Sequence, residues 1–185
     1  MDVLEAILTR HSIAKVKPDP IARELIEKLL QSAVQAPNHH HLRPWRFVVL
    51  KGESRKALGE IMVNSLRQKD PYLSEAAFEI ERAKPLRAPL LISVGVDKPN
   101  DPRVPEIENI CAVAAAVENL LLAAHAEGLG AMWRTGQAAR DPEVKKFLGF
   151  AVDQEILGFI YIGYADMQAP DAKRPSFEDR TVWME

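Results

Sequence analysis

The stretch Cys111-Ala112-Val113-Ala114-Ala115-Ala116-Val117 lies at the centre of the strongest helix pattern in this sequence, residues 105–127. Pro105 suits the first turn of a helix, and Gly128 suits the position just after the last turn. The central residues are apolar on every side, which is typical of a helix that is buried all round. Their small side chains also allow a second subunit to approach closely. For the single cysteine, Cys111, a small buried apolar residue is a better interpretation than a nucleophile.

The segments on either side of this helix alternate between helix and strand patterns. Short apolar runs predict strands at residues 45–50, 88–96, 130–133 and 156–164, with Pro89 at the start of the second. Helical spacing predicts helices over residues 2–9, 21–33, 53–67 and 73–83, and a short helix after Asp141-Pro142. The tail after Ala165 is polar and contains proline, so we expect it to wrap over a surface. The pattern predicts one α+β domain over residues 1–185, in which helices flank a central mixed or antiparallel sheet of about four to five strands.

Composition narrows the class of protein. The 185 residues are 47 % hydrophobic and 27 % charged, with a net charge of −2, as in an ordinary globular domain. So balanced a charge gives no field to attract nucleic acid or anionic lipid, and we expect neither partner. One cysteine excludes an internal disulfide and a four-thiolate zinc site. No run approaches the ~20 apolar residues of a membrane span, and the N-terminus lacks a signal-peptide pattern, so we expect a cytoplasmic protein.

Several catalytic motifs are absent from the sequence. No Gly-x-Gly-x-x-Gly follows a strand, and there is no phosphate-binding lysine loop of the Walker type. There is also no His-Glu-x-x-His and no Gly-x-Ser-x-Gly. These absences argue against a Rossmann nucleotide site, a zinc protease and a serine hydrolase.

The first polar segment that could carry chemistry is Arg10-His11-Ser12, at the end of the first predicted helix. The guanidinium of Arg10, the hydroxyl of Ser12 and local backbone N–H groups could together hold a phosphate. His11 adds a donor. On these residues alone, a helix end whose cations complement the helix dipole is the more common interpretation.

The second segment runs from Ala36 to Trp45 and contains His39, His40 and His41. Alternate histidines in an extended segment face the same way, so His39 and His41 could bind a metal as a pair. A metal site would need a third ligand, and no Asp, Glu or Cys stands close by, so we expect no metal. The remaining interpretations are a solvated loop, or a polar loop that lines a planar ligand.

The third segment is Gly128-Leu129-Gly130-Ala131-Met132-Trp133-Arg134-Thr135-Gly136. Glycines at both ends allow the backbone to approach a ligand closely. Trp133 offers an aromatic wall, and Arg134 and Thr135 offer donors. A simple helix–strand turn that leads into a strand is an equally good interpretation.

Together and in this order, the three segments resemble the nitroreductase family of FMN-dependent oxidoreductases, and in particular its compact bacterial NAD(P)H nitroreductases. The likeness runs through residues 10–12, 36–37, 44–49, 130–136 and 158–163. It implies a nitroreductase-like fold and a homodimer that binds FMN at the subunit interface.

The resemblance also implies roles for individual residues. Arg10, His11 and Ser12 would hold the FMN phosphate and ribityl chain, and Arg174 would join the phosphate site. The partner subunit would contribute its Gln35, His39 and His41, and the flavin ring would lie along Trp133, Arg134 and Thr135. Two positions depart from the family pattern. Ala14, beside Lys15, stands where many members have a cation near flavin N1, and His41 stands where many have asparagine.

The activity implied by the resemblance is hydride transfer from NAD(P)H, through the flavin, to a nitroaromatic or quinone-type acceptor with ping-pong kinetics. The flavin carries this chemistry, so no catalytic side chain is expected. One alternative keeps the flavin fold with another reaction: reductive dehalogenation, flavin breakdown or dehydrogenation of a bound substrate. A non-enzymatic alternative is a small metal- or ligand-sensing dimer that uses the His39–His41 loop.

Overall fold

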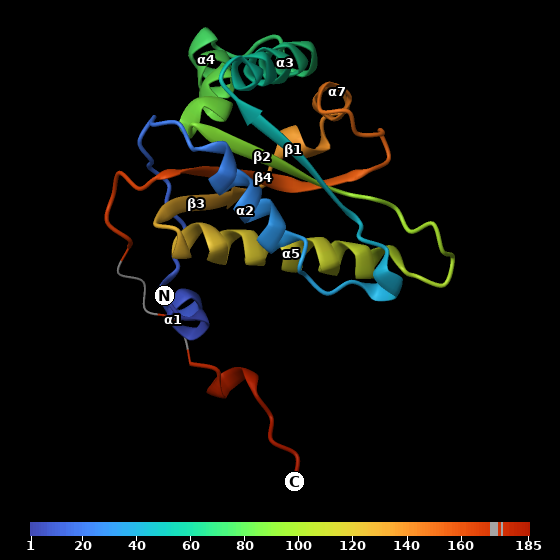
Figure 1. Cartoon of the computed structure of the whole chain (residues 1–185). Helices are drawn as coiled ribbons and strands as arrows, with labels where there is room; N and C mark the ends of the chain where they lie inside the picture. Colours follow the sequence, from blue (N-terminus) through green and yellow to red (C-terminus); the bar gives the residue numbers. More distant parts are fainter. Residues whose placement is uncertain (171–173, 175) are drawn as a thin grey trace.

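The computed structural model describes residues 1–170, 174 and 176–185. The described residues form a sheet of four antiparallel strands in the order β1 (Trp45–Lys51), β2 (Leu90–Val96), β4 (Glu155–Tyr164) and β3 (Leu129–Arg134) (Figure 1). Every residue of β2 is buried, as expected of a continuous apolar run at the centre of a sheet with both faces covered. The predicted α+β class is confirmed, with four strands and no parallel pair among the four.

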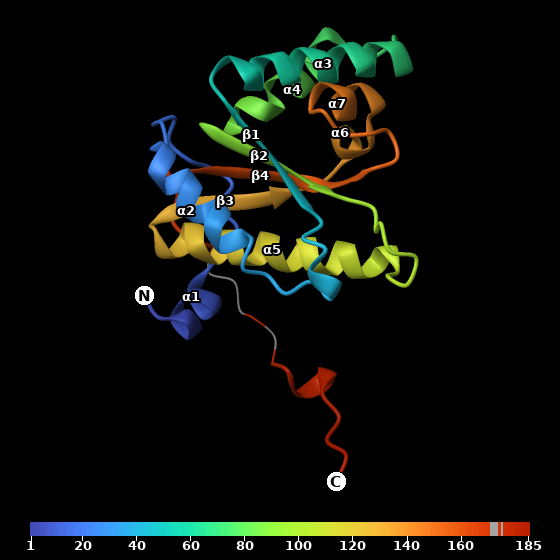
Figure 2. The same ribbon diagram turned by 45° about the vertical axis from the view of Figure 1, so that its right-hand side comes forward.

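Helix α5 (Glu106–Ala126) crosses one face of the sheet beside helix α2 (Arg23–Ala33) (Figures 1 and 2). Val113, Val117 and Leu120 of α5 have no exposed surface, and they pack in one cluster with inward-facing residues of β2 and β4. By length and hydropathy alone α5 could cross a membrane, but 44 % of the tested window is buried inside the protein. In this structure α5 is a core helix.

The opposite face of the sheet is covered by helices α3 (Glu53–Lys69), α4 (Glu75–Ala83), α6 (Gln137–Arg140) and α7 (Pro142–Phe147) (Figure 2). A short 3₁₀ helix, η2 (Lys84–Arg87), leads from α4 into β2. Leu58, Leu91 and Phe159 belong to the hydrophobic cluster on this side. The sequence patterns missed α6 and η2, because four residues are too few to show helical periodicity.

The prediction that α5 is buried all round is wrong for the single chain. Cys111 is exposed, Ile107 on the same side is 60 % exposed, and Ala115 is only partly buried. The sheet and α2 cover two sides of the helix, and the short helix α1 (Val3–Thr9) touches a third near its C-terminal half (Figure 1). An apolar stripe is therefore left uncovered, and Cys111 lies in it rather than in the core.

The end of the C-terminal tail does not cover the surface of its own chain, although Asp166 and Arg174 contact Lys15 and Arg10. Residues 176–185, including the short helix η3 (Glu178–Arg180), are exposed and lead away from the sheet (Figure 1). Phe177 is 64 % exposed and Trp183 is 80 % exposed. The expected wrapping is therefore not found for residues 176–185, whose few apolar side chains pack against nothing in this chain. For residues 171–173 and 175, the prediction lies outside the described residues.

A buried carboxylate fixes α7 against α3. Asp141 caps α7 by accepting hydrogen bonds from the N–H groups of Glu143 (2.9 Å) and Val144 (3.2 Å). It also accepts from the Ser65 hydroxyl and pairs with Lys69, both on α3. Burial disfavours its charged form, but the bonds from Lys69, Ser65 and Val144 outweigh burial and lower the pKa of the Asp141 carboxyl.

Replacing Asp141 with alanine should lower the free energy of unfolding by about 2 kcal/mol near neutral pH, since a cap and a charge-assisted bond are lost together. Because the pKa is lowered on folding, the contribution is present above the ordinary aspartate range and is lost as the pH falls through the lowered pKa. In urea unfolding, the difference in the free energy of unfolding between wild type and Asp141→Ala should be smaller at about pH 3 than at about pH 7. Asp19→Ala, at an exposed position, is the control. An equal gap at both pH values would contradict this account.

Candidate functional site

The outer edge of β3 is only half covered. Ser12 forms a parallel bridge with Ala131, and the Ile13 N–H donates to the Ala131 carbonyl at 3.0 Å. The N–H and C=O of one strand residue point to the same side, so Trp133, two residues on, directs its backbone groups to this edge as well. No described strand pairs with Met132–Arg134 on that side. The second half of β3 therefore offers backbone donors and acceptors to a ligand.

Positive charge gathers at the covered end of this edge. Arg10 ends α1, and its Nε lies 3.3 Å from Oε1 of Glu118 on α5. The guanidinium of Arg174 donates to the Arg10 carbonyl, and Nε2 of His125 lies 2.8 Å from Oγ1 of Thr9. Burial, followed by the positive charges of Arg10 and His11, lowers the pKa of His125. The guanidinium groups of Arg10 and Arg174 supply the charged donors that suit an anionic group such as a phosphate.

The structure thus brings together four residues that the sequence analysis assigned to the phosphate: Arg10, His11, Ser12 and Arg174. It adds His125, which the sequence analysis missed. The only signal for His125 in the sequence was a basic residue in the last turn of α5.

The uncovered end of the edge is shaped by Trp133 and Arg134. The indole Nε1 of Trp133 donates to the Leu157 carbonyl at 3.1 Å, which holds a side chain that is 37 % exposed. The Arg134 guanidinium lies 5.7 Å from the ring centroid of Tyr161, within the range of a cation–π contact. The two neighbouring side chains project to opposite faces of the sheet, as strand geometry requires.

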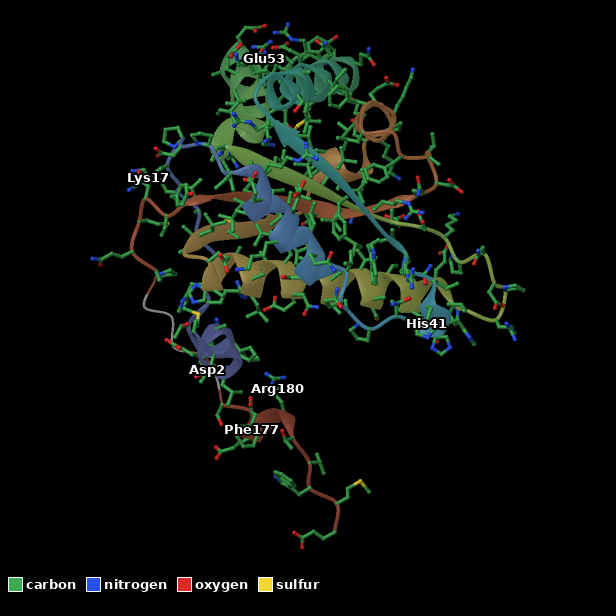
Figure 3. All side chains as sticks on the ribbon, in the orientation of Figure 1. Asp2, Lys17, His41, Glu53, Phe177 and Arg180 are labelled. Atoms are coloured by element: carbon green, nitrogen blue, oxygen red, sulfur yellow. The ribbon has the colours of Figure 1, made fainter. Side chains whose placement is uncertain are left out.

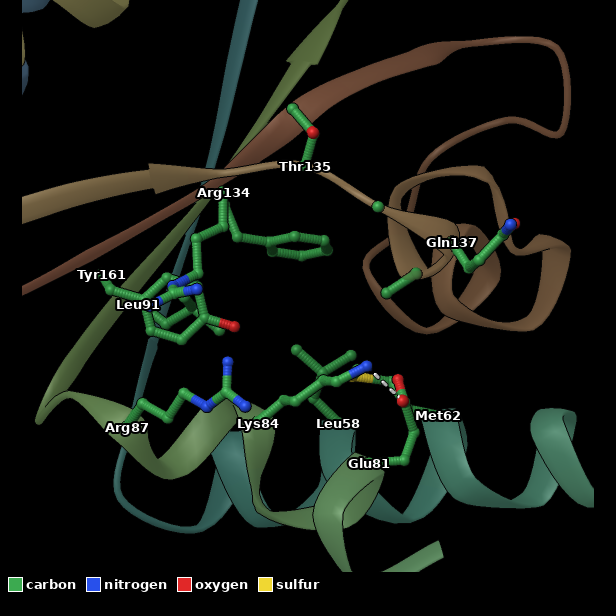
Figure 4. A pocket seen from close by; sticks show the side chains of 13 residues that line it. Leu58, Met62, Glu81, Lys84, Arg87, Leu91, Arg134, Thr135, Gln137 and Tyr161 are labelled. Atoms are coloured by element: carbon green, nitrogen blue, oxygen red, sulfur yellow. Dashed lines mark hydrogen bonds and ion pairs between the residues drawn. The ribbon is translucent and has the colours of Figure 1, made fainter. Parts of the chain in front are cut away.

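Beside Arg134 and Thr135 is a pocket of about 380 Å³, bounded by η2, α3, β4 and the segment that follows β3 (Figure 4). Its lining combines apolar side chains such as Leu58 and Phe159 with the cations Lys84, Arg87 and Arg134. The sequence analysis named Arg134 and Thr135 but missed the two cations of η2. In the sequence they look like ordinary charged residues before a strand.

The hydroxyl of Tyr161 faces this pocket (Figure 4). Burial raises the pKa of Tyr161, while the positive charges of Arg87 and Arg134 act in the opposite direction with a smaller effect. Tyr161 therefore remains a neutral phenol near neutral pH and can donate a hydrogen bond into the pocket.

The histidine loop lies elsewhere. It forms a short 3₁₀ helix, η1 (His39–His41), in which Nδ1 of His39 is 3.7 Å from Oε2 of Glu108, near the N-terminal end of α5. In Figure 3, His41 lies at that end of α5. Asp2, the residue that precedes α1, lies toward the other end. Along the helix axis, Glu108 and Glu118, the partner of Arg10, are about 15 Å apart. One chain therefore does not bring His39 or His41 to the phosphate residues.

The loop is also strained. His40, His41 and Arg43 have φ values of +48°, +53° and +49°, a left-handed region that residues with a side chain rarely adopt. Clusters of this kind concentrate at ligand sites. The side-chain amide of Gln35, which follows α2 and precedes the loop, donates to the Gln31 carbonyl at 3.1 Å. Within the described part of the chain, no three His, Cys, Asp or Glu residues lie close enough to form a metal site.

The sequence and the fold of this chain are similar to those of known proteins. The model of the "Nitroreductase family" matches residues 7–164. The Escherichia coli (strain K12) protein named "Putative NAD(P)H nitroreductase YdjA" is 29 % identical over 169 residues, which cover 91 % of each chain. A solved structure of a "Nitroreductase-like Family Protein" from Bacillus cereus has a TM-score of 0.85 and 29 % identity, covering 100 % of this chain and 97 % of that one.

A solved structure of a "putative nitroreductase in complex with fmn" from Desulfovibrio desulfuricans has a TM-score of 0.73 and 25 % identity, again covering 100 % and 97 % of the two chains. The chain belongs to the nitroreductase family. The predicted family and the predicted nitroreductase-like fold are both confirmed.

The position of Trp133 depends on Gly158. Its φ is +144°, and a Cβ there would lie 2.5 Å from the Arg134 carbonyl oxygen and 2.6 Å from Nε1 of Trp133. Gly158→Ala should therefore displace Trp133, change the near-ultraviolet circular dichroism and cost about 2 kcal/mol of stability. Gly149→Ala is the control, since Gly149 also has positive φ (+78°) but open space around it. If Gly158→Ala leaves the near-ultraviolet circular dichroism as unchanged as the control does, Gly158 does not hold Trp133 in place.

Proposed function

We propose that this protein is an FMN-dependent oxidoreductase that uses NAD(P)H to reduce nitroaromatic or quinone-type acceptors. The observation that carries the proposal is the half-covered edge of β3, with cations at one end and a polar, partly aromatic pocket at the other. The family supports it, as do the relative named as an NAD(P)H nitroreductase and the similar structure in complex with FMN.

The donor set fits FMN, which has an anionic end and a planar end. Arg10, His11 and Arg174 would bind the phosphate, with Ser12 beside the ribityl chain. Trp133, Arg134 and Thr135 would lie along the flavin ring, where the free backbone groups of β3 can bond its heteroatoms. Bound FMN would supply two-electron transfer, by accepting hydride from the nicotinamide and passing it to the acceptor.

The residues of this chain would bind and orient the cofactor rather than attack a substrate. Cys111 lies outside the pocket beside β3, and we assign no side chain there as a nucleophile. One open site that serves donor and acceptor in turn implies ping-pong kinetics. We propose that residues 1–185 act as one cytoplasmic domain.

A second copy of the chain would complete the site. The uncovered stripe of α5 includes Ile107 and Cys111, and α1, which contacts the same helix, exposes apolar residues such as Val3 (72 % exposed) and Leu4 (71 %). A surface of this kind marks a protein interface. If two α5 helices pack antiparallel about a two-fold axis, the loop of one chain lies beside the phosphate residues of the other. The partner's Gln35, His39 and His41 would then contact the flavin.

The direct test is the identity of the cofactor. The purified protein should be yellow and release FMN on denaturation, and it should oxidise NAD(P)H steadily when a quinone or nitroaromatic compound is added. Treatment with a chelator should leave this activity unchanged. A colourless protein that neither takes up added FMN nor oxidises NAD(P)H would refute the proposal.

Arg10→Ala should weaken FMN binding by roughly one to two orders of magnitude, because it removes a charge-assisted contact with the phosphate. The fold should persist, since Arg10 is at a helix end outside the core. Equilibrium dialysis with FMN measures the affinity, and Arg23→Ala on the exposed face of α2 is the control. Wild-type affinity in Arg10→Ala would show that the phosphate binds elsewhere.

Ala115→Glu should separate the two subunits, because it would place an unpaired carboxylate in the α5 interface. Sedimentation should report a monomer. The binding of FMN to this monomer should be weakened. The matched control is Ala76→Glu on α4, which introduces the same charge at an exposed helical position. A yellow, active wild-type monomer would overturn the dimer.

A further inference from the structure

The pocket beside β3 contains two guanidinium groups that the proposed function has not fully used. Lys84 pairs with Glu81, so these two residues carry no net charge into the pocket. Among the described residues, Arg87 has no hydrogen-bond or ion-pair partner, and neither does the Arg134 side chain, which only faces the ring of Tyr161. In Figure 4, Arg87 rises from η2 toward Tyr161, while Lys84 turns to Glu81.

We propose that Arg87, acting with Arg134, forms a cationic wall for the carbonyl-bearing edge of the flavin ring and favours the reduced cofactor. This inference rests on the proposed function. It assigns the electrostatic role to a residue of η2, because Arg87 lines the pocket and its guanidinium has no partner among the described residues. Ala14 is uncharged, and Nζ of Lys15 is 2.9 Å from Oδ2 of Asp166.

The change of charge on the cofactor during the reaction would make such a group favourable. Hydride transfer oxidises NAD(P)H to NAD(P)⁺ and adds one negative charge to the flavin, so the reduced ring carries a charge that the oxidised ring lacks. A nearby fixed cation therefore binds the reduced form more tightly than the oxidised form. Arg87 remains charged at every accessible pH, so it can serve in this way without gaining or losing a proton.

The rest of the pocket suits the same ligand edge. Tyr161 supplies a neutral hydroxyl that faces the pocket and can donate to a carbonyl oxygen. The apolar side chains of Leu58, Leu91 and Phe159 exclude water from one side, which strengthens the attraction between a guanidinium and an anion. The pocket is continuous with Arg134 and Thr135, so one planar ligand can contact both the edge of β3 and Arg87.

The test uses the FMN-loaded protein and measures the midpoint potential of bound FMN together with the affinity for oxidised FMN. Arg87→Gln should weaken the binding of reduced FMN relative to oxidised FMN by about tenfold, the size of one charge-assisted contact. For a two-electron couple, a tenfold change lowers the potential by about 30 mV. Arg140→Gln, an exposed arginine on nearby α6 that does not line the pocket, should leave the potential unchanged.

Two further variants separate charge from structure. Arg87→Lys keeps a cation, so the midpoint potential of bound FMN should stay close to its wild-type value. Ala14→Lys in the Arg87→Gln background should restore it, by placing a cation two residues after Ser12, beside the edge of β3. If Arg87→Gln fails to fold, Arg134→Gln tests the same cationic wall and should also lower the potential of bound FMN.

The inference is overturned if bound FMN keeps its potential in Arg87→Gln. It is also overturned if the only effect is a higher KM for an acidic acceptor, because the pocket would then bind the acceptor. Both results leave the proposed function intact, since FMN is still bound and reduced. If the wild-type protein binds no FMN, the proposed function itself fails, and that outcome is distinguishable from the first two.

Discussion

The packing of α5 across one face of the sheet determines the position of nearly everything else in the protein. Val113, Ala116, Val117 and Leu120 are fully buried against the strands and α2, and so fix the rotation of the helix about its axis. That rotation turns Glu118 toward Arg10 at the end of α1, and Glu108 toward His39 in the loop. The same rotation leaves Ile107 and Cys111 uncovered. One hydrophobic contact thus sets both halves of the candidate site and the surface that a second chain would cover.

The second constraint is the incomplete edge of β3. An edge strand with free backbone groups is a liability unless something covers it. Here Ser12 and Ile13 pair with Ala131 and cover the first half, and the chain then leaves β3, with Val16 bridging to Ala165 just after β4. The open half lies between a cationic cluster and a pocket that itself contains cations. The proposed cofactor would satisfy the remaining backbone groups, so binding and protection of the edge would be the same event.

The sequence predicted the parts of the fold that depend on local patterns. The strands at 45–50, 88–96 and 156–164 were found within two residues of their bounds, because β-branched and aromatic residues end there at Gly, Pro or charged residues. The exposure of Cys111 could not be predicted, since an apolar helix looks the same whether its last side faces its own core or another subunit. Lys84, Arg87 and His125 were missed for a similar reason. Their importance comes from the elements that fold beside them, and neighbours in space leave no mark on the spacing of one sequence.

The division of the site has a thermodynamic consequence for the proposed function. In a single chain the histidine loop and the phosphate residues contact opposite parts of α5, so a monomer would offer only part of the contacts to FMN. A ligand that binds the dimer more tightly than the monomer stabilises the dimer by mass action, and the dimer in turn raises the ligand affinity by the same factor. The strained φ values of His40, His41 and Arg43 fit this view. Their conformational cost is met by the fold before the ligand arrives, so the partner's loop would meet the cofactor already ordered, and less of the contact energy would be lost in arranging it.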